Sequence, residues 1–244
     1  MTSVTSGGLS AETLATIDDY ASHTLACPPD MARSGGVHIL AAHERALPGW
    51  HGFTLPILGL AFDAGAVIAC RPNLVPRLRA EMGSDQYLPS LDAPALRRLV
   101  RTVRRLVPNA FTLGGDLRAC DVAGFMPSPT ASRAELIPRA DPAAQHLRSR
   151  FDGDVFGVRG PRDRVISWAA LKLKASTVWE LAVGTDADYR GRGYARDVVS
   201  AATRFVLDHG RVPIYVHDRD NSTSAFVARA VGYRIYAQIV LGEY

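Results

Sequence analysis

The sequence predicts an α/β protein with a mixed, mostly antiparallel sheet and flanking helices. Apolar runs at 155–159, 164–174 and 177–185 are separated by connections too short for a helix, which is typical of antiparallel strands. An amphipathic helix is then expected over 193–209, and the strand-like run Val212–His217 follows it. Because a strand–helix–strand unit makes a right-handed crossover to a parallel strand, the sheet must be mixed.

The part of the chain before residue 140 shows a weaker α+β pattern. Ser10 can cap a helix whose apolar residues recur every three or four positions as far as Leu25. The runs 37–40, 53–60 and 64–70 are punctuated by Pro and Gly, as strands of a small sheet often are. We therefore expect a small α+β region ahead of the better defined second half.

The clearest helix of that region begins at Asp92 and Pro94 and has one apolar and one basic face. The basic face consists of Arg97, Arg98, Arg101, Arg104 and Arg105. Nucleic-acid-binding proteins usually add interleaved aromatic residues or a recognisable module, and neither is present here. A solvated face is the simpler interpretation, so we expect no nucleic-acid partner. The net charge of +4 fits an anionic small molecule equally well.

The segment from Pro127 to Ala143 is rich in Pro, Ser and Ala, which is typical of a connection between substructures. We place a domain boundary near residue 140. A chain of 244 residues can hold two small domains, here 1–140 and 141–244. The first is expected to be an accessory domain or a degenerate copy of the second.

No segment predicts export or membrane insertion. The longest apolar stretch, 55–70, is interrupted by Gly59, Asp63 and Gly65, and the polar N-terminus lacks a signal-peptide pattern. We therefore expect a cytoplasmic protein. The cysteines are widely spaced and have no neighbouring ligand pattern, so neither a disulfide framework nor a metal site is predicted; they are Cys27, Cys70 and Cys120.

A glycine-rich turn, Tyr189–Ala195, connects the last antiparallel strand to the long helix. Gly191 and Gly193 permit torsions that other residues avoid, and the helix that follows offers unpaired N–H groups and the positive end of its dipole. The turn therefore predicts a phosphate site, with a tight packing turn as the alternative. It has neither the Lys-Ser/Thr pair of a P-loop nor the spacing of a Rossmann fingerprint.

Three sequence features in order carry a family resemblance. The segment Arg190–Ala195 has the pattern Arg-x-x-Gly-x-Ala and follows a strand that ends in Val183–Thr185. Farther on, Asn221–Ser224 and Val231–Tyr233 are similar to an Asn-x-x-Ala and a Leu-Gly-Phe position. In these features the second half resembles the GCN5-related N-acetyltransferase (GNAT) superfamily. The residues before 140 show none of its motifs.

The resemblance implies that residues 141–244 form an acetyl-CoA-binding catalytic domain. The backbones of Val183 and Thr185 would then run beside the pantetheine arm in a gap between splayed parallel strands, and Asn221 would contact the cofactor from the last helix. The pyrophosphate would be held by Arg190, Gly191, Arg192, Gly193, Tyr194 and Ala195. No metal is implied.

An acceptor amine must lose a proton before it attacks a thioester. Glu180 is the first candidate base, with an ion pair to an arginine such as Arg164 as the alternative role. His217 is the second candidate, with a structural hydrogen-bonded histidine as the alternative. The family's usual general acid, a Tyr seven residues after the Asn, is replaced here by Ala228.

The expected activity is direct acetyl transfer from acetyl-CoA to an amine in a ternary complex. The acceptor could be a small molecule or a peptide, and a homodimer is left open. The alternative is a non-catalytic acyl-CoA-binding or sensor module. The aromatic cluster Trp50–Phe53 could form a wall of the acceptor site or simply pack.

Overall fold

The structure is a computed structural model of the chain, and it describes residues 8–31, 34–63, 65–82 and 93–244. Asp92, which the sequence places at the start of the arginine-rich helix, lies outside these ranges.

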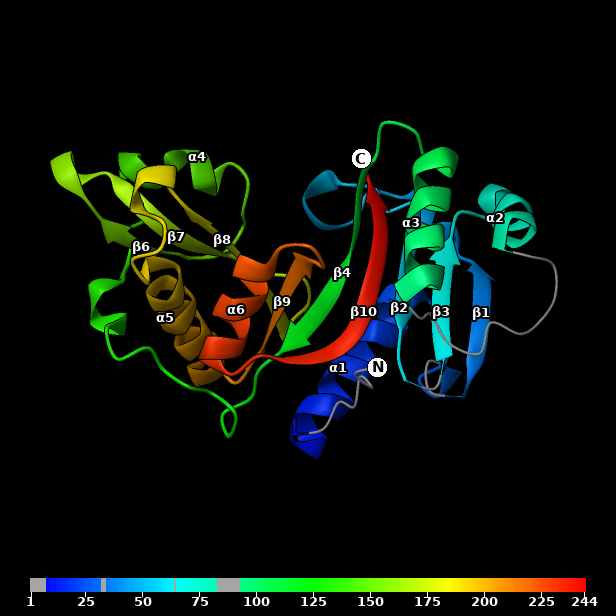
Figure 1. Cartoon of the computed structure of the whole chain (residues 1–244), viewed down its shortest axis with the longest axis horizontal. Coiled ribbons are helices and arrows are strands. Elements are labelled where there is room, and N and C mark those ends of the chain that lie inside the picture. The colour runs from blue at the N-terminus through cyan, green and yellow to red at the C-terminus, as the bar shows by residue number, and fades with distance from the viewer. Residues whose placement is uncertain (1–7, 32–33, 64, 83–92) are drawn as a thin grey trace.

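Ten strands of the described residues form one sheet, ordered β1-β3-β2-β10-β4-β9-β8-β7-β6-β5 (Figure 1). They are β1 Gly36–Ala41, β2 Ile57–Ala61, β3 Gly65–Cys70, β4 Phe111–Ala119, β5 Glu135–Leu136, β6 Val155–Arg159, β7 Val165–Lys172, β8 Val178–Thr185, β9 Val212–Asp218 and β10 Arg234–Glu243. The pairs β1–β3 and β8–β9 are parallel, and the other strand pairs are antiparallel. The predicted mixed, mostly antiparallel sheet is confirmed.

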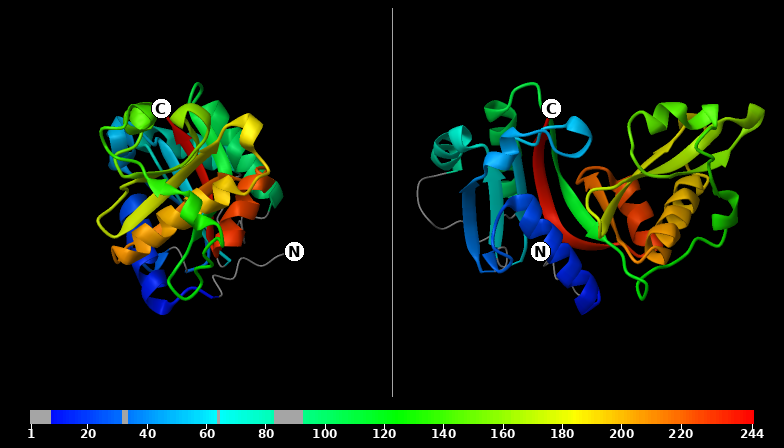
Figure 2. Two further views of the ribbon diagram at one scale, coloured as in Figure 1. Left: turned by 90° about the vertical axis from the view of Figure 1, so that its left-hand side faces the viewer. Right: turned by 180° about the vertical axis from the view of Figure 1, so that it is seen from behind.

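Helices cover both faces of this sheet. They are α1 Ala11–Leu25, α2 Val75–Met82, α3 Ala93–Leu106, α4 Gln145–Arg148, α5 Tyr194–Asp208 and α6 Ser222–Val231. In Figure 1, α3, α5 and α6 lie in front of the sheet, and the view from behind in Figure 2 shows α1 across the other face. Ile17, Ala21 and Leu25 of α1 pack into the core on that rear face, as the predicted spacing requires.

The last strand joins the two parts of the chain. β10 is antiparallel to β2 on one side and to β4 on the other. Residues near the C-terminus therefore lie between two strands of the first part of the chain. At the other end of the sheet, the short strand β5 pairs with β6. Strands from both sides of residue 140 therefore alternate along one sheet, and the domain division at that residue stays a prediction.

The strand β4 was not expected from the sequence because two adjacent glycines, Gly114 and Gly115, interrupt its apolar pattern. The structure explains the second of them. A β-carbon on Gly115 would lie 1.9 Å from the carbonyl oxygen of His217 on β9. Only glycine permits β4 and β9 to approach this closely. Gly115 therefore interrupts the apolar pattern of β4 and at the same time makes its pairing with β9 possible.

The elements of the second half follow the sequence closely. β6, β7 and β8 form the expected antiparallel meander, and β9 is parallel to β8 after the crossover through α5. Gly232 ends α6 at a φ of 102°, which glycine adopts without strain. Among the residues that the structure describes, no helix combines the length and apolar character that crossing a membrane demands.

Candidate functional site

The parallel strands β8 and β9 separate halfway along their length. Their pairing runs from Val178 opposite Val212 to Leu181 opposite Tyr215 and then stops. β8 continues to Thr185 along β7, and β9 continues to Asp218 along β4. The facing edges of the two strand ends thus have no strand partner among the described residues, which leaves backbone N–H and C=O groups available to a ligand.

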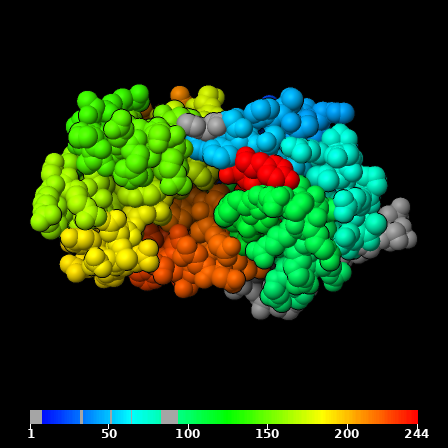
Figure 3. Space-filling view, turned by 90° about the horizontal axis from the view of Figure 1, so that it is seen from above, coloured from blue at the N-terminus to red at the C-terminus, as the bar shows by residue number. Residues whose placement is uncertain are grey.

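The surface is hollowed where the strands separate. Seen from above in Figure 3, a depression lies over the orange residues that follow β9, between the yellow-green strands of the second half and the blue and green segments of the first. Both parts of the chain therefore contribute to the walls around the open strand ends.

The glycine-rich turn has the backbone geometry that an anion site needs. Gly191 has a φ of 75° and Gly193 a φ of 83°, and Gly193 is the N-cap of α5 with no side chain bonded to the helix end. A β-carbon on Gly191 would meet nothing within 4 Å. The first N–H groups of α5 have no acceptor within the helix, so they can bind an anion through the main chain.

Three arginines lie in this turn or in the helical turn that follows it. The Nε of Arg190 donates to the carbonyl oxygen of Thr185 at 3.2 Å, which ties the turn to the end of β8. Arg192 lies over the ring of Tyr189, with its Cζ 5.4 Å from the centroid. Arg196, in the first turn of α5, has a buried Nε without a hydrogen-bond partner among the described residues.

Asn221 lies at the N-terminus of α6, where its side chain has a structural role. Its Oδ1 accepts a hydrogen bond of 3.0 Å from the N–H of Ser224 and so caps the helix. The carbonyl half of the amide is thereby engaged, and the NH₂ group is the part that could reach a ligand.

Glu180 is held between two lysines. Its Oε1 lies 2.7 Å from Nζ of Lys172, and its Oε2 lies 3.6 Å from Nζ of Lys174. Burial by itself would raise the pKa of Glu180, but the two cations outweigh it and hold the pKa below its ordinary value. The arginine partner suggested from the sequence was wrong, because Arg164 pairs with Asp186 instead.

His217 belongs to a buried polar cluster on β4 and β9. Its Nδ1 donates to the carbonyl oxygen of Asp218 at 2.8 Å, so the lone pair lies on Nε2, which accepts from Nε of Arg118 at 2.8 Å. Arg118 also donates to Asp116 at 3.0 Å. Burial lowers the pKa of the Arg118 guanidinium, and the charge of Asp116 opposes that effect.

Glu180 and His217 lie at different points along the strand pair. Glu180 is opposite Ile214, where β8 and β9 are still hydrogen-bonded, whereas His217 lies beyond the last pair, on the separated end of β9. The structure therefore brings His217 closer to the open strand ends, and it builds Glu180 into a closed ion-pair cluster.

The position of the expected general acid is filled by Ala228, which is fully buried. Two tyrosines belong to the same core cluster. Tyr215 shares a hydrogen bond of 2.8 Å with Ser224, and Tyr233 shares one of 2.7 Å with Thr203. Burial raises the pKa of both hydroxyls, so each is a weaker acid than an exposed tyrosine.

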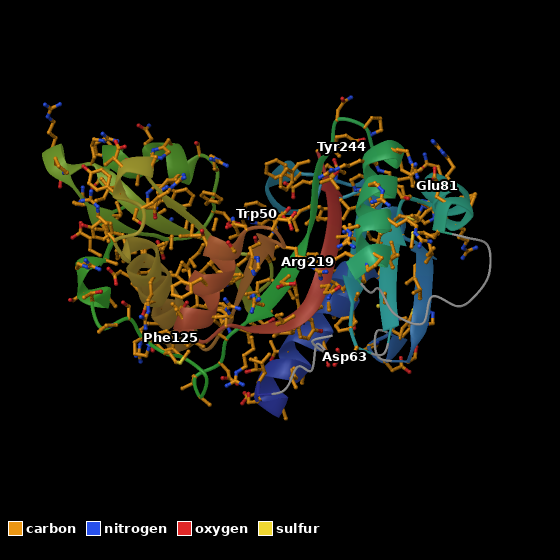
Figure 4. All side chains as sticks on the ribbon, in the orientation of Figure 1. Trp50, Asp63, Glu81, Phe125, Arg219 and Tyr244 are labelled. Atoms are coloured by element: carbon orange, nitrogen blue, oxygen red, sulfur yellow. The ribbon has the colours of Figure 1, made fainter. Side chains whose placement is uncertain are left out.

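Trp50 connects the two halves beside this region (Figure 4). Its Nε1 donates to Asp152 at 2.7 Å, and Nζ of Lys174 lies 4.3 Å from its ring centroid. The ring also packs against a buried cluster that includes Val155 and Ala170, and Ala182 on the separated end of β8 packs against the same cluster. Trp50 thus packs between the two halves, and a role of the aromatic cluster as a wall of the acceptor site stays a prediction.

Two arginines near the turn were missed from the sequence. Arg196 could have been found, because it directly follows the motif and must lie in the first helical turn. Arg133 could not, since it belongs to a segment that the sequence identifies only as a connection. In the described ranges, no group of three His, Cys, Asp or Glu side chains could hold a metal ion.

No family model and no curated protein matches the sequence. The fold is similar to a GNAT-family protein from Novosphingobium aromaticivorans, at 21% identity and a TM-score of 0.47 over 55% of this chain. It is also similar to a GCN5-related N-acetyltransferase from Kribbella flavida, at 20% identity and a TM-score of 0.42 over 53% of this chain. This chain spans 64% and 57% of the length of those two proteins.

A third match extends over nearly the whole molecule. A tandem GNAT protein from the clavulanic acid biosynthesis pathway has 14% identity and a TM-score of 0.44, and the match covers 96% of this chain and 94% of that one. Identities and TM-scores this low support a resemblance alone. In its sequence motifs and in the solved structures that it matches, the chain resembles the GCN5-related N-acetyltransferases.

Proposed function

We propose that the chain binds acetyl-CoA and transfers the acetyl group directly to an amine. The observation that carries this proposal is the separation of β8 from β9 immediately before an uncapped, glycine-rich helix start. The first feature can hold an extended chain between two strand edges, and the second can hold its phosphates. Their order along the sequence matches the motifs of the family that the chain resembles.

The residues present fit the phosphate groups of such a cofactor. The positive φ angles of Gly191 and Gly193 and the free N–H groups of α5 form a main-chain cradle. We propose Arg196, in the first turn of α5, as a further donor, since its Nε has no hydrogen-bond partner among the described residues. In the proposal, this cradle is completed by Arg190, Arg192, Tyr194 and Ala195, with Asn221 contacting the cofactor from α6.

The strand ends would orient the rest of the cofactor. The backbones of Val183 and Thr185 on the free edge of β8 can hydrogen-bond an amide-containing arm, as an added strand would. When bound, acetyl-CoA supplies an activated thioester. An N–H on the separated edge can then stabilise negative charge on the thioester oxygen, which requires no catalytic side chain.

The acceptor amine must lose a proton, and we propose His217 and Glu180 as the candidate bases in that order. His217 lies on the separated end of β9, and its Nε2 becomes available when the hydrogen bond from Arg118 opens. Glu180 has a lowered pKa, which makes it a weaker proton acceptor, and two lysines occupy its oxygens.

The second candidate function is a non-catalytic acyl-CoA-binding module. The contacts of Glu180 and His217 favour it, because both candidate bases are engaged by cationic side chains. The burial of Ala228 at the position of the usual acid points in the same direction. A module of this kind would bind acetyl-CoA with the same residues and release it unchanged.

The acceptor in the first proposal is a small molecule or a peptide amine, and we place the reaction in the cytoplasm. Trp50 and Trp168 lie against the face of β7 and β8 opposite α5, and they would line the acceptor side of the site. We propose no nucleic-acid or membrane partner, and a homodimer is compatible with the site.

Calorimetric titration of acetyl-CoA tests the cofactor site. Gly193→Asp places a carboxylate in the cradle and should abolish binding, because it obstructs and repels the pyrophosphate. Gly210→Asp is the matched control: Gly210 has a φ of 64° and open space around it, but it lies at the other end of α5. Binding to the wild type and the control but not to Gly193→Asp supports the proposal. A wild type that does not bind acetyl-CoA refutes both candidate functions.

An amine panel then separates the two functions. Acetyl transfer to any acceptor, followed as free CoA thiol, supports the enzyme. Tight binding of acetyl-CoA without transfer across small amines, amino acids and peptide N-termini supports the module.

A further inference from the structure

A buried carboxylate fastens the first turn of α5 to the segment before β5. Asp197 has no solvent exposure, and it accepts hydrogen bonds of 2.7 Å from both Ser128 Oγ and Thr130 Oγ1. Arg133 Nε donates to the same carboxylate at 2.8 Å. In Figure 1 this green segment passes along α5 before it enters β5. The stretch that the sequence identifies as a connection is therefore anchored to the helix that begins at the glycine-rich turn.

Asp197 holds the guanidinium of Arg133 against the turn. Its Nη2 lies 3.5 Å from the position that a β-carbon on Gly193 would occupy. Its Cζ lies 4.8 Å from the ring centroid of Tyr194, the first residue of α5. A cation from a distant part of the sequence is thus placed beside the N–H groups that start the helix.

The contacts of Arg133 leave part of its donor capacity unused. A guanidinium has five N–H donors, and the recorded contacts to Asp197 and Thr130 use only Nε and Nη2. Nη1 makes no hydrogen bond with the residues that the structure describes, and the side chain is 39% exposed. Because Ser128 and Thr130 also donate to Asp197, Arg133 is not the sole partner of that carboxylate.

We infer that Arg133 is a direct contact of the cofactor pyrophosphate, in addition to the residues of the motif. The inference rests on the proposed function, since it names a further binding residue of the same site. Asp197 acts as the positioning residue, because it holds Arg133 beside the turn through Nε and Nη2 and leaves Nη1 for the phosphate. An arginine suits this role since one edge of its guanidinium can bind a carboxylate while the remaining nitrogen donates to a phosphate oxygen.

Titration of CoA into Arg133→Gln tests the contact. Loss of one charge-assisted hydrogen bond should weaken binding roughly tenfold or more. The dependence of Kd on salt should also become shallower, because one ionic contact is gone. Arg133→Lys keeps the charge without the fork and should fall between the variant and the wild type. Dephospho-CoA retains the pyrophosphate, so its binding should weaken by the same factor.

Ser128→Ala is the matched control, because it removes a donor to Asp197 and keeps the guanidinium. It should bind CoA as the wild type does, and thermal unfolding checks that each variant is folded. Equal losses in Ser128→Ala and Arg133→Gln, with the salt dependence unchanged, would mean that Arg133 only supports the fold. A loss confined to CoA and absent with dephospho-CoA would assign Arg133 to the 3′-phosphate and overturn the inference.

The same titrations distinguish failure of the Arg133 contact from failure of the proposed cofactor binding. If the wild type binds CoA and Arg133→Gln binds it equally well, this inference fails and the proposed function stands. If the wild type does not bind CoA, the proposed function fails and the inference fails with it.

Discussion

Nζ of Lys172 on β7 lies 2.7 Å from the carboxylate of Glu180, its direct partner across the strand pair on β8. With Lys174 nearby, this contact holds the pKa of Glu180 below its ordinary value of 4.5, against the opposing effect of burial. A carboxyl group with a lowered pKa stabilises the fold above the pKa of the unfolded state. That contribution is lost as the pH falls through the lower, folded value.

Lys172→Met should therefore destabilise the protein in a pH-dependent manner. At pH 7 the free energy of unfolding should fall by about 3 kcal/mol or less, because a buried pair is broken while Lys174 remains. The difference from the wild type should shrink as the pH falls below about 4.5, where the carboxyl group becomes protonated. Urea unfolding at a series of pH values measures it. Arg164→Met, which removes an exposed ion pair, should change little, and a loss independent of pH would contradict the argument.

His217→Gln should lower turnover roughly a hundredfold or more and leave the Kd of acetyl-CoA unchanged. The reason is its position on the separated end of β9, beyond the last hydrogen-bonded pair with β8. Single-turnover kinetics with a saturating acceptor measure the effect.

Glu180→Gln is the companion variant. It leaves two lysines without a counter-charge and should lower stability before it affects the chemical step. A variant with full stability and no turnover would identify Glu180 as the base and overturn the order proposed here.

Asn221→Ala should lower the free energy of unfolding by about 1 kcal/mol, because it removes the cap of α6. Asn221→Asp retains an oxygen that can accept from Ser224 and should keep most of that stability. If the amide NH₂ contacts the cofactor, as proposed, Asn221→Asp should nevertheless weaken acetyl-CoA binding. Chemical denaturation and calorimetry separate the two effects, and unchanged binding would restrict Asn221 to its capping role.

Trp50→Phe should cost about 1 kcal/mol of stability, since phenylalanine cannot donate to Asp152. A double-mutant cycle with Asp152→Ala isolates this contact, and the coupling between the two changes should account for most of the loss. Additive effects would mean that the hydrogen bond contributes little and that Trp50 acts through packing alone.

The elements around the site could be predicted because their signals are local. The helix from Tyr194 to Asp208 has a continuous apolar face, and glycines mark the turn before it and the end of α6. Periodicity and turn residues act over a few positions, so a sequence shows them directly. The order of the sequence motifs along the chain also indicated the resemblance to an acetyltransferase family.

The contact partners of individual side chains were harder to predict from the sequence. The sequence suggests an arginine such as Arg164 as the partner of Glu180, but β7 and β8 are paired so that Lys172 faces the carboxylate. A shift of one residue in that register would have turned Lys172 to the other face of the sheet. Residue identity indicates that Glu180 needs a cation, and only strand register decides which one.

The sequence by itself determined the mixed sheet of the second half, the glycine-rich turn and the helix behind it. Only the tertiary structure decided that β10 lies between β2 and β4, and that Arg133 reaches the turn through Asp197. The physical reason is the range of the interactions. Helix periodicity and glycine torsions are fixed by neighbouring residues, whereas a strand edge or a buried carboxylate accepts any chemically suitable partner that the packing of the whole chain brings to it.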